Sequence, residues 1–491
     1  MPPQKKKVLL YSEKEYIRKL KKLEEKNARL LEKYSAVRTD EKYLKKRVRE
    51  LTKSRDLWKR KSRDKSLKTK QLAAKLKRRE KAKRHQYALW IVTVCINLRA
   101  QCGCSYRSIR KILLIFASSF QLDISRIPCA NTIQNWNSKM GLHALENVDN
   151  QLVGQEVSLI VDESIRLGKE KLLLILLSPL NKVSKEALCS QDVVIGFMGG
   201  RAGWPGVDIA QIIKEKLIAK NYHVKVLVSD EGSNLRKAAR ELGVAHLADI
   251  SHAIATCLRK TFEQNPDYKS FIKLLKHYRA KGVNQDLSYL CPPKQRTKAR
   301  FMNQKCLVRW AMTLLEKIDT LNETEAAFFS ELKAHEPIIK CLEKALEWAQ
   351  HISLPLKTTG LSKATIKKAL QQLEDCSTQD ELLIQFKAFF KAYLVDYELF
   401  VKDREGHYNV SSEIIESMFG VYKEKISENP LAGITLVSLE LPLHCMTEKD
   451  IKQETKEALE GIFTTDLKNW VASHAADNQL VKRLKFFKKR T

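Results

Sequence analysis

Long apolar runs are missing from this sequence, and so are cysteine pairs at metal-binding spacing. No uninterrupted apolar stretch reaches the roughly 18 residues that a membrane-spanning helix needs. The apolar stretch after the first lysines is too short for a secretory signal. The 11 cysteines are scattered, and the closest pair, Cys102 and Cys104, has no second cysteine or histidine pair at ligand spacing. We therefore expect reduced thiols and a soluble cytoplasmic protein.

Acidic residues are also scarce. The chain has 57 Asp and Glu against 89 Lys and Arg, which gives a formal charge of +32. Residues 1–84 contain 33 basic and 11 acidic residues, so a net charge of +22 lies in about one sixth of the chain. Clustered positive charge of this size indicates a polyanionic partner, most often nucleic acid. We expect the protein to bind DNA and to associate with the nucleoid.

Proline and glycine are absent from the stretch between Tyr16 and Trp58, which carries a heptad repeat with Leu20 at position a and Leu23 at position d. Ten of the 13 seam positions are apolar or aromatic, and Asn27 occupies an a position, where it sets register in parallel dimers. The pattern predicts a coiled coil that oligomerises the protein, with a dimer favoured and higher states left open. The alternative is a solitary charged helix. Beyond Trp58, a basic helical extension would neutralise phosphates.

A helical module is predicted from about residue 86 to residue 150. Its helices flank Gly103 and a loop with Pro128, an arrangement that indicates a helix-turn-helix. The helix from Asn131 would be the recognition helix, because it carries side chains that read base edges or grip phosphates. These are Thr132, Gln134, Asn135, Asn137 and Lys139. The alternative is a small helical packing domain.

Strand patterns begin at Gln155. Three apolar strands with tight connections are followed by strand and helix alternation, which predicts an α/β core with a mixed sheet. Residues 263–403 then read almost wholly helical and predict an all-α insertion in that core. The predicted domains are a basic coiled coil and arm (10–85), a helix-turn-helix-like module (86–150), the core's first part (155–262), the insertion (263–403), the core's final helix (404–440) and a helical basic tail (441–491).

Three acidic residues stand out in this core. Asp162 and Asp230 each follow an apolar strand, and ligands gather at such strand ends. Glu416 lies on an amphipathic helix, with six residues between it and Lys423. If these elements pack together, the carboxylates suit two Mg²⁺ or Mn²⁺ ions for phosphoryl transfer. Taken singly, each Asp could equally be a helix or turn cap.

The order of these features resembles the RNase H-like catalytic core of DDE transposases: Asp after a first strand, Asp after a fourth, a helical insertion, then Glu-x₆-Lys. Asp249-Ile-Ser-His252 resembles the C/D-x₂-H motif of hAT-type enzymes, and Arg309-Trp310 resembles the RW pair of their insertion. The order of the helical module and the first strand along the chain is similar to that in bacterial insertion-sequence transposases. The resemblance covers roughly residues 87–440 and rests on order and spacing, not on any single motif.

The resemblance implies roles for individual residues. Asp162, Asp230 and Glu416 would be the catalytic metal ligands, and His252 would assist at the scissile phosphate or order the site. Lys423, Arg309 and Trp310 would contact DNA, with the indole stacking on a flipped or distorted base. Taken alone, His252 could be a polar residue at a helix start and Trp310 a core residue.

Some positions depart from the family pattern or leave alternatives open. A related signature has Tyr and Arg where this chain has Asn409 and Ser412, so that submotif is only half present. Glu413, one turn before Glu416, is the alternative third ligand. Glu163 and Glu231 sit beside the two Asp residues and are expected to be bystanders, because alternation in a strand points neighbours to opposite faces.

The sequence therefore predicts a DNA transposase that binds terminal inverted repeats and target DNA, and that performs metal-dependent cleavage and strand transfer as a homo-oligomer. A domesticated, inactive DNA-binding protein and a stand-alone RNase H-like nuclease are the alternatives.

Overall fold

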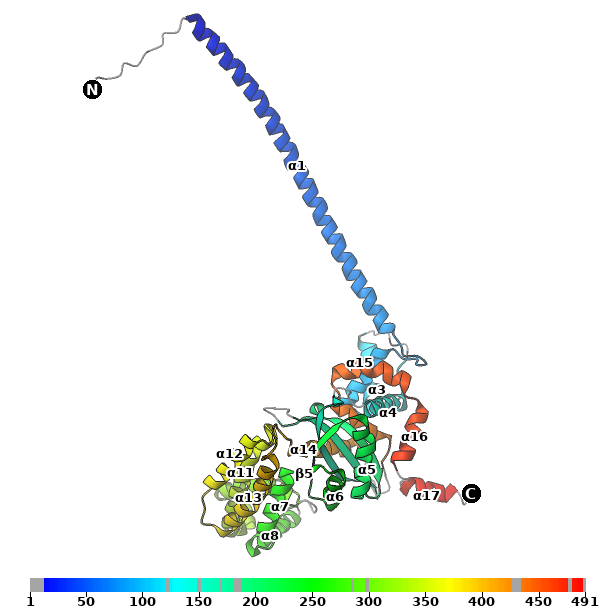
Figure 1. The fold of residues 1–491 in the computed structure, drawn as a ribbon, viewed down its shortest axis with the longest axis vertical. Helices are drawn as coiled ribbons and strands as arrows, with labels where there is room; N and C mark the ends of the chain where they lie inside the picture. The colour runs from blue at the N-terminus through cyan, green and yellow to red at the C-terminus, as the bar shows by residue number, and fades with distance from the viewer. Residues whose placement is uncertain are drawn as a thin grey trace, which may run out of the picture. The chain divides into compact units, whose positions relative to one another are not determined.

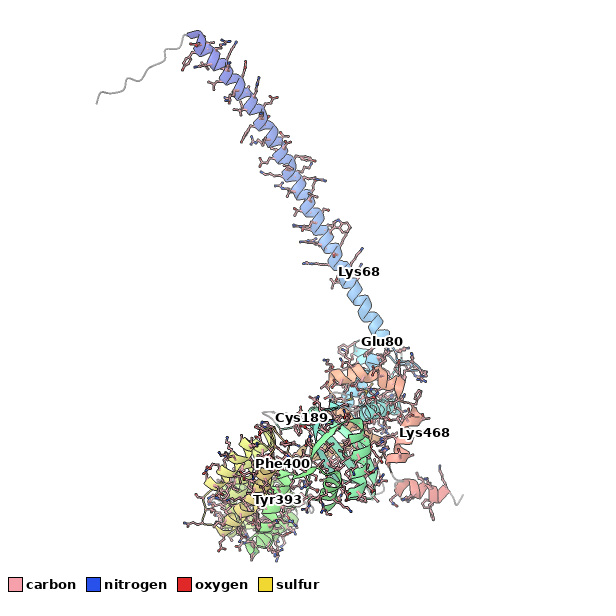
Figure 2. The ribbon with its side chains drawn as sticks, in the orientation of Figure 1. Lys68, Glu80, Cys189, Tyr393, Phe400 and Lys468 are labelled. Carbon is pink, nitrogen blue, oxygen red and sulfur yellow. The ribbon has the colours of Figure 1, made fainter. Side chains whose placement is uncertain are left out.

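The computed structural model describes residues 13–120, 124, 126–147, 152–167, 170–180, 187–283, 287–295, 300–425, 434–475 and 479–488. The chain divides into two compact units, one up to Glu80 and one from Lys81 onward. In the first unit, a single helix, α1 (Glu13–Arg79), contains the whole predicted heptad stretch. Every described side chain of α1 is exposed, including the seam residues Leu20 and Leu23 (Figure 2). The helix is thus confirmed, while its pairing with another helix stays a prediction.

The second unit is built around one five-stranded sheet. Its strands are β1 (Glu156–Leu167), β2 (Glu170–Pro179), β3 (Val194–Arg201), β4 (His223–Ser229) and β5 (Ala245–Ala248), in the order β3-β2-β1-β4-β5. β2 runs antiparallel to both β1 and β3, whereas β4 runs parallel to β1 and β5 parallel to β4. The predicted mixed sheet is confirmed. β2 is a near-continuous apolar run because both faces of the sheet are covered.

The two faces of the sheet carry different helices. On one face, Leu159 and Val161 pack in a cluster with α5 (Gly206–Lys216) and α6 (Ser233–Leu242). On the other, Ile160 packs with α14 (Glu413–Lys425), while Val228 of β4 packs with α7 (Ile250–Phe262). Because neighbouring residues of a strand point to opposite faces, this division assigns Asp162 to the face of α14.

The segment between α7 and α14 is helical, as the sequence predicts. It contains α8 (Pro266–Gly282), α9 (Gln304–Lys317), α10 (Glu323–Phe329), α11 (Glu336–Thr358), α12 (Lys363–Asp375) and α13 (Glu381–Val401). These helices share one hydrophobic cluster with α7, and α8, α11, α12 and α13 are seen gathered beside it in Figure 1. The helices start where polar caps predict, for example at Asn322, Ser362 and Asp380.

The predicted helix-turn-helix segment and the C-terminal tail form one core instead of two separate parts. The N-terminal helices are α2 (Leu89–Ala100), α3 (Tyr106–Ser119) and α4 (Ala130–Glu146), and the tail contains α15 (Glu448–Gly461), α16 (Thr464–His474) and α17 (Gln479–Lys488). Residues of α2, α3, α4 and α15 share a hydrophobic cluster. A buried ion pair, Arg99 with Glu440 at 2.8 Å, joins α2 to the 3₁₀ turn η9 (Leu436–Glu440). Neither segment alone covers its apolar faces.

Gly141 allows the closest approach in this core. A Cβ at this position of α4 would lie 1.6 Å from the carbonyl oxygen of Leu439. We expect Gly141→Ala to lower the free energy of unfolding by about 3 kcal/mol, despite alanine's better helix propensity, because the backbone of η9 must move. Gly420→Ala in α14 is the matched control, since a Cβ there meets nothing within 4 Å. It should gain about 0.5–1 kcal/mol. Thermal unfolding of both variants checks this, and equal melting temperatures would contradict it.

None of the helices among the described residues is both long enough and apolar enough to cross a membrane.

Candidate active site

The register between β1 and β4 sets Asp162 and Asp230 next to each other. Ile160 pairs with Val228 across the two parallel strands. Each Asp lies two residues beyond this pair: Asp230 directly follows β4, whereas Asp162 lies within β1, which continues to Leu167 and does not end at Asp162 as predicted. Adjacent strands are about 4.8 Å apart. Carboxylates carried by adjacent strands at this spacing are close enough to act on one ligand.

A tight turn orients the Asp230 carboxylate. Its Oδ1 accepts a hydrogen bond of 2.9 Å from the backbone N–H of Gly232. A Cβ at residue 232 would lie 2.9 Å from that same oxygen, so glycine permits the close approach. The hydroxyl of buried Ser229 donates to the Asp230 carbonyl. Local hydrogen bonds therefore fix where β4 ends and α6 begins.

Helix α14 delivers Glu416 to the same face. Its apolar stripe, formed by Ile415, Met418, Phe419 and Tyr422, is buried in the cluster that contains Ile160. Glu416 lies on the exposed side, with 41% of its side chain accessible. Its Oε1 is 3.2 Å from Nε2 of His252, which lies in the first turn of α7.

The imidazole of His252 is surrounded by negative charge. Burial, the largest single effect, lowers its pKa, but the hydrogen bond to Glu416 and the charges of Asp249, Glu416 and Asp230 outweigh it and raise the pKa to about 9. His252 is therefore a cation near neutral pH. Its electrostatic coupling to both Asp230 and Glu416 indicates that these two acids lie around one imidazole.

Asp249 ties α7 to the start of α14. Its side chain is fully buried, and its Oδ1 caps α7 by accepting from the N–H of His252 at 2.7 Å. Its Oδ2 accepts from the N–H of Ser412 at 2.5 Å and from the Ser412 hydroxyl at 3.0 Å. Burial is the main cause that raises the pKa of Asp249. The N–H of Ile250 also bonds the carbonyl of Val410, so these two chain segments are held together twice.

Glu413, the alternative third ligand, has basic and polar partners of its own. Its Oε1 accepts from Lys357 of α11 at 2.5 Å and from Ser251 at 2.7 Å. Partial burial, the largest effect, opposes ionisation, yet these two hydrogen bonds lower the pKa of Glu413. Glu413 thus pairs with the helical insertion, whereas Glu416 pairs with His252.

The donor set suits Mg²⁺ or Mn²⁺ in chemistry, because all three candidates are carboxylates. Asp162 and Asp230 are brought to neighbouring positions, and Glu416 reaches the same group of residues through His252. As arranged, the part of the chain that the structure describes holds no group of three or more His, Cys, Asp or Glu side chains placed to bind a metal. The candidate ligands therefore suit Mg²⁺ or Mn²⁺ in chemical type, and the sheet register is compatible with a shared site. The geometry of metal binding stays a prediction.

The two acids beside the Asp residues lie in other surroundings. Glu163 pairs with Lys171 at 3.0 Å. Glu231 accepts from the hydroxyl of Tyr393 at 2.5 Å and lies 4.0 Å from Arg236. These partners are consistent with the expectation that neither is a metal ligand.

The predicted base-reading residues of α4 are unevenly accessible. Asn137 is fully buried, and its amide donates to the carbonyl of Ile133. Lys139 is partly buried, with its ammonium 3.4 Å from the carbonyl of Leu459. Packing of α4 against the C-terminal helices therefore turns these two side chains inward, which argues against base reading by them. Thr132 and Gln134 are partly accessible and Asn135 is exposed, so these three can meet DNA.

The other predicted DNA contacts also differ in exposure. Arg309 and Lys423 are exposed. Trp310 is partly buried against the core of the insertion, where its indole N–H donates to the carbonyl of Leu290 at 3.0 Å. Its ring lies 6.3 Å from that of Phe329. These contacts favour the core role for Trp310 over base stacking.

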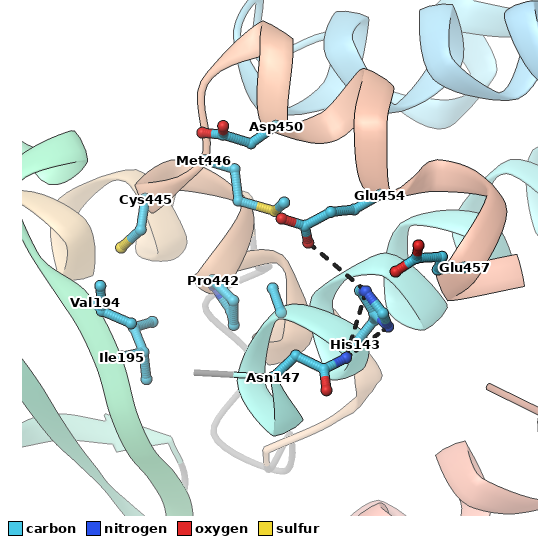
Figure 3. Close-up of a pocket in the computed structure, with 11 residues that line it drawn as sticks. His143, Asn147, Val194, Ile195, Pro442, Cys445, Met446, Asp450, Glu454 and Glu457 are labelled. Carbon is cyan, nitrogen blue, oxygen red and sulfur yellow. Dashed lines mark hydrogen bonds and ion pairs between the residues drawn. The ribbon is translucent and has the colours of Figure 1, made fainter. Parts of the chain in front are cut away.

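A separate pocket of about 710 Å³ lies away from the acids on the sheet (Figure 3). Its walls come from the end of α4, the start of β3, the 3₁₀ turn η10 (Pro442–Cys445) and α15. His143 lies 3.6 Å from Glu454 there and contacts Asn147. Burial lowers the pKa of His143. Sequence reasoning did not anticipate this pocket, because it joins segments about 300 residues apart in the chain.

Comparisons with known proteins find matches among solved structures. No family model matches the chain, and no curated protein matches it in sequence. A solved structure, the Drosophila P element transposase strand transfer complex, is similar with a TM-score of 0.41 and 14% identity over 77% of this chain and 94% of that one. At this level the similarity concerns the fold alone and assigns no residue.

Proposed function

We propose that this chain is a DNA transposase that cleaves element ends and joins them to target DNA. The observation that supports the proposal is the parallel register of β1 and β4, in which Ile160 pairs with Val228 two residues before Asp162 and Asp230, together with the packing of α14 on Ile160. The strand order and the helical segment before α14 support an RNase H-like core with an insertion. The net charge of +32 supports DNA as the substrate.

In this proposal, Asp162, Asp230 and Glu416 hold two Mg²⁺ or Mn²⁺ ions. When bound, such ions supply charge stabilisation at the scissile phosphate and activate water or a 3′-hydroxyl as nucleophile. Asp249 and Ser412 keep α7 and α14 together. His252, a cation near neutral pH, orients Glu416 and places positive charge where DNA phosphate would enter. Exposed Lys423 and Arg309 would grip the DNA backbone.

The test uses DNA from either side of the gene, which an autonomous element carries as inverted repeats. The full chain is incubated with this DNA and Mg²⁺ or Mn²⁺, and strand breaks are mapped. Breaks at the repeat tips that disappear in Asp230→Asn and in Glu416→Gln support the transposase and select Glu416 over Glu413. If breaks ignore the repeats, the chain is a general nuclease.

A domesticated DNA-binding protein is the second candidate. The contact between Glu416 and His252 favours it, because that carboxylate is engaged by a cation in this structure. Tight DNA binding without any break under either metal would select this candidate.

The coiled-coil part of the proposal is tested by changing the seam of α1. We expect the wild-type chain to form dimers. The double variant Leu23→Lys/Leu30→Lys should be monomeric, because lysines of the two helices would face each other in the buried seam at two consecutive d positions. Ala28→Lys with Ser35→Lys adds the same charge at outer positions and should stay dimeric. Sedimentation measures the mass of each variant. A monomeric wild type would select the solitary helix instead.

A further inference from the structure

We propose that the helical insertion positions the catalytic carboxylates through two side chains, Lys357 and Tyr393, which hold the acidic neighbours of Glu416 and Asp230. The inference rests on the proposed function, because it assigns a purpose to residues that flank its metal ligands. Neither side chain belongs to a recognised sequence pattern, and both lie on helices of the insertion, α11 and α13.

The first contact fixes the start of α14. Lys357 reaches from α11 to Glu413 at 2.5 Å, and only 19% of its side chain is exposed. Ser251 of α7 donates to the same carboxylate oxygen at 2.7 Å. Glu413 is the first residue of α14 and lies three residues before Glu416. Because residues three apart lie on one side of a helix, holding Glu413 sets the rotation of α14 and hence the direction of Glu416.

The second contact fixes the end of β4. The Tyr393 hydroxyl donates to Glu231 at 2.5 Å, and burial followed by this hydrogen bond raises the pKa of Tyr393, so the phenol stays protonated. One turn later on α13, Tyr397 donates to the carbonyl of Ala248 at 2.6 Å. Glu231 directly follows Asp230, so this contact restrains the turn that carries the catalytic acid.

Both contacts originate from one body of packed helices. α11 and α13 pack in the same hydrophobic cluster as α7, to which Val228 also contributes, and Tyr393 lies within this body (Figure 2). A movement of the insertion would therefore displace the surroundings of Asp230 and Glu416 together. Since a misplacement of about 1 Å can lower a rate about 10²-fold, these contacts matter for the chemistry more than for the fold.

The test combines kinetics with amide hydrogen exchange on the full chain. Lys357→Met is expected to lower the cleavage rate about 10- to 100-fold while the Kd for DNA changes less than about twofold. Amides of residues 413–425 should exchange about tenfold faster. Tyr393→Phe removes only a hydroxyl and should speed exchange in residues 230–232. Lys357→Arg should keep most activity.

A charge swap separates positioning from direct ligation. Lys357→Glu combined with Glu413→Lys restores an ion pair of opposite polarity, and we expect it to recover the slow exchange and most of the cleavage rate. If Glu413 were itself a metal ligand, the swap would recover exchange without cleavage, which would overturn the proposed role.

The matched control is Lys391→Met, which breaks a 2.5 Å ion pair with Glu374. This pair joins two helices within the insertion and not the insertion to the sheet. It should leave rate and exchange unchanged. If amide hydrogens of residues 413–425 in Lys357→Met and of residues 230–232 in Tyr393→Phe exchange as slowly as in the wild type, the inference is overturned. If the wild type cleaves no DNA, the proposed function fails, and the exchange measurements alone still decide whether the insertion restrains these segments.

Discussion

Asp162→Asn is expected to lower the rate of DNA strand cleavage about 10³-fold, with DNA affinity and melting temperature close to those of the wild type. The β1–β4 register brings the chain segments of Asp162 and Asp230 together, and the Asp162 carboxylate is proposed to hold a catalytic ion. Asparagine keeps the shape but removes the charge, and a loss of about 4 kcal/mol of transition-state stabilisation corresponds to this factor. Single-turnover cleavage of end DNA with saturating Mg²⁺ measures it.

Glu163→Gln provides the matched control for this change. It alters the adjacent residue in the same way and breaks only the pair with Lys171. A partly exposed pair of this kind contributes at most about 1 kcal/mol to folding, so cleavage should stay within a few-fold of the wild type. If Glu163→Gln lost as much activity as Asp162→Asn, the assignment of the two neighbours would be wrong.

Asp249→Ala is expected to lower the free energy of unfolding by about 3 kcal/mol. The substitution removes a fully buried carboxylate that accepts hydrogen bonds from the backbone N–H of His252, the backbone N–H of Ser412 and the Ser412 hydroxyl. Each buried donor left without an acceptor costs about 1–3 kcal/mol. For a unit that spans Lys81–Thr491 the melting temperature should fall by roughly 3–4 °C, which calorimetry on the full chain would measure.

Asp380→Ala separates this effect from ordinary helix capping. Asp380 caps α13 by accepting from two backbone N–H groups but is exposed. Its removal should cost about 1 kcal/mol. Equal losses for the two variants would show that Asp249 does no more than cap α7. A larger loss for Asp249→Ala, with faster exchange in residues 410–416, would establish it as the connection between α7 and α14.

Local patterns predicted the elements of the core well. Asp162 and Asp230 were singled out because each follows an apolar run. Asp230 does follow β4, but β1 continues past Asp162 to Leu167, because its pairing with β2 extends beyond the apolar run. The stripe on α14 likewise predicted its buried side, since Ile415 and Phe419 lie on one face at helical spacing. In both cases the prediction depends on residues that lie close together in the sequence.

For Asn137 and Trp310, local patterns predicted contacts with DNA, but the packing of both side chains argues against these roles. A helix with Gln, Asn and Lys residues reads as a DNA-binding surface, but α15 and α16, more than 300 residues later, cover part of it. Trp310 sits in the motif-like pair Arg309-Trp310, yet its indole is held by the insertion's own core. The same long-range packing brought Lys357 to Glu413 and Tyr393 to Glu231 without any sequence signal.

The sequence by itself determined most strands and helices, the position of Asp230 after its strand and the strong positive charge, because each depends on residues close together in the chain. Only the tertiary structure decided which side chains face the acids, which are buried, and that the insertion contacts Glu231 and Glu413. The physical reason is that burial and ion pairing depend on elements that meet only after folding. A periodic pattern identifies an apolar face but not the element that will cover it.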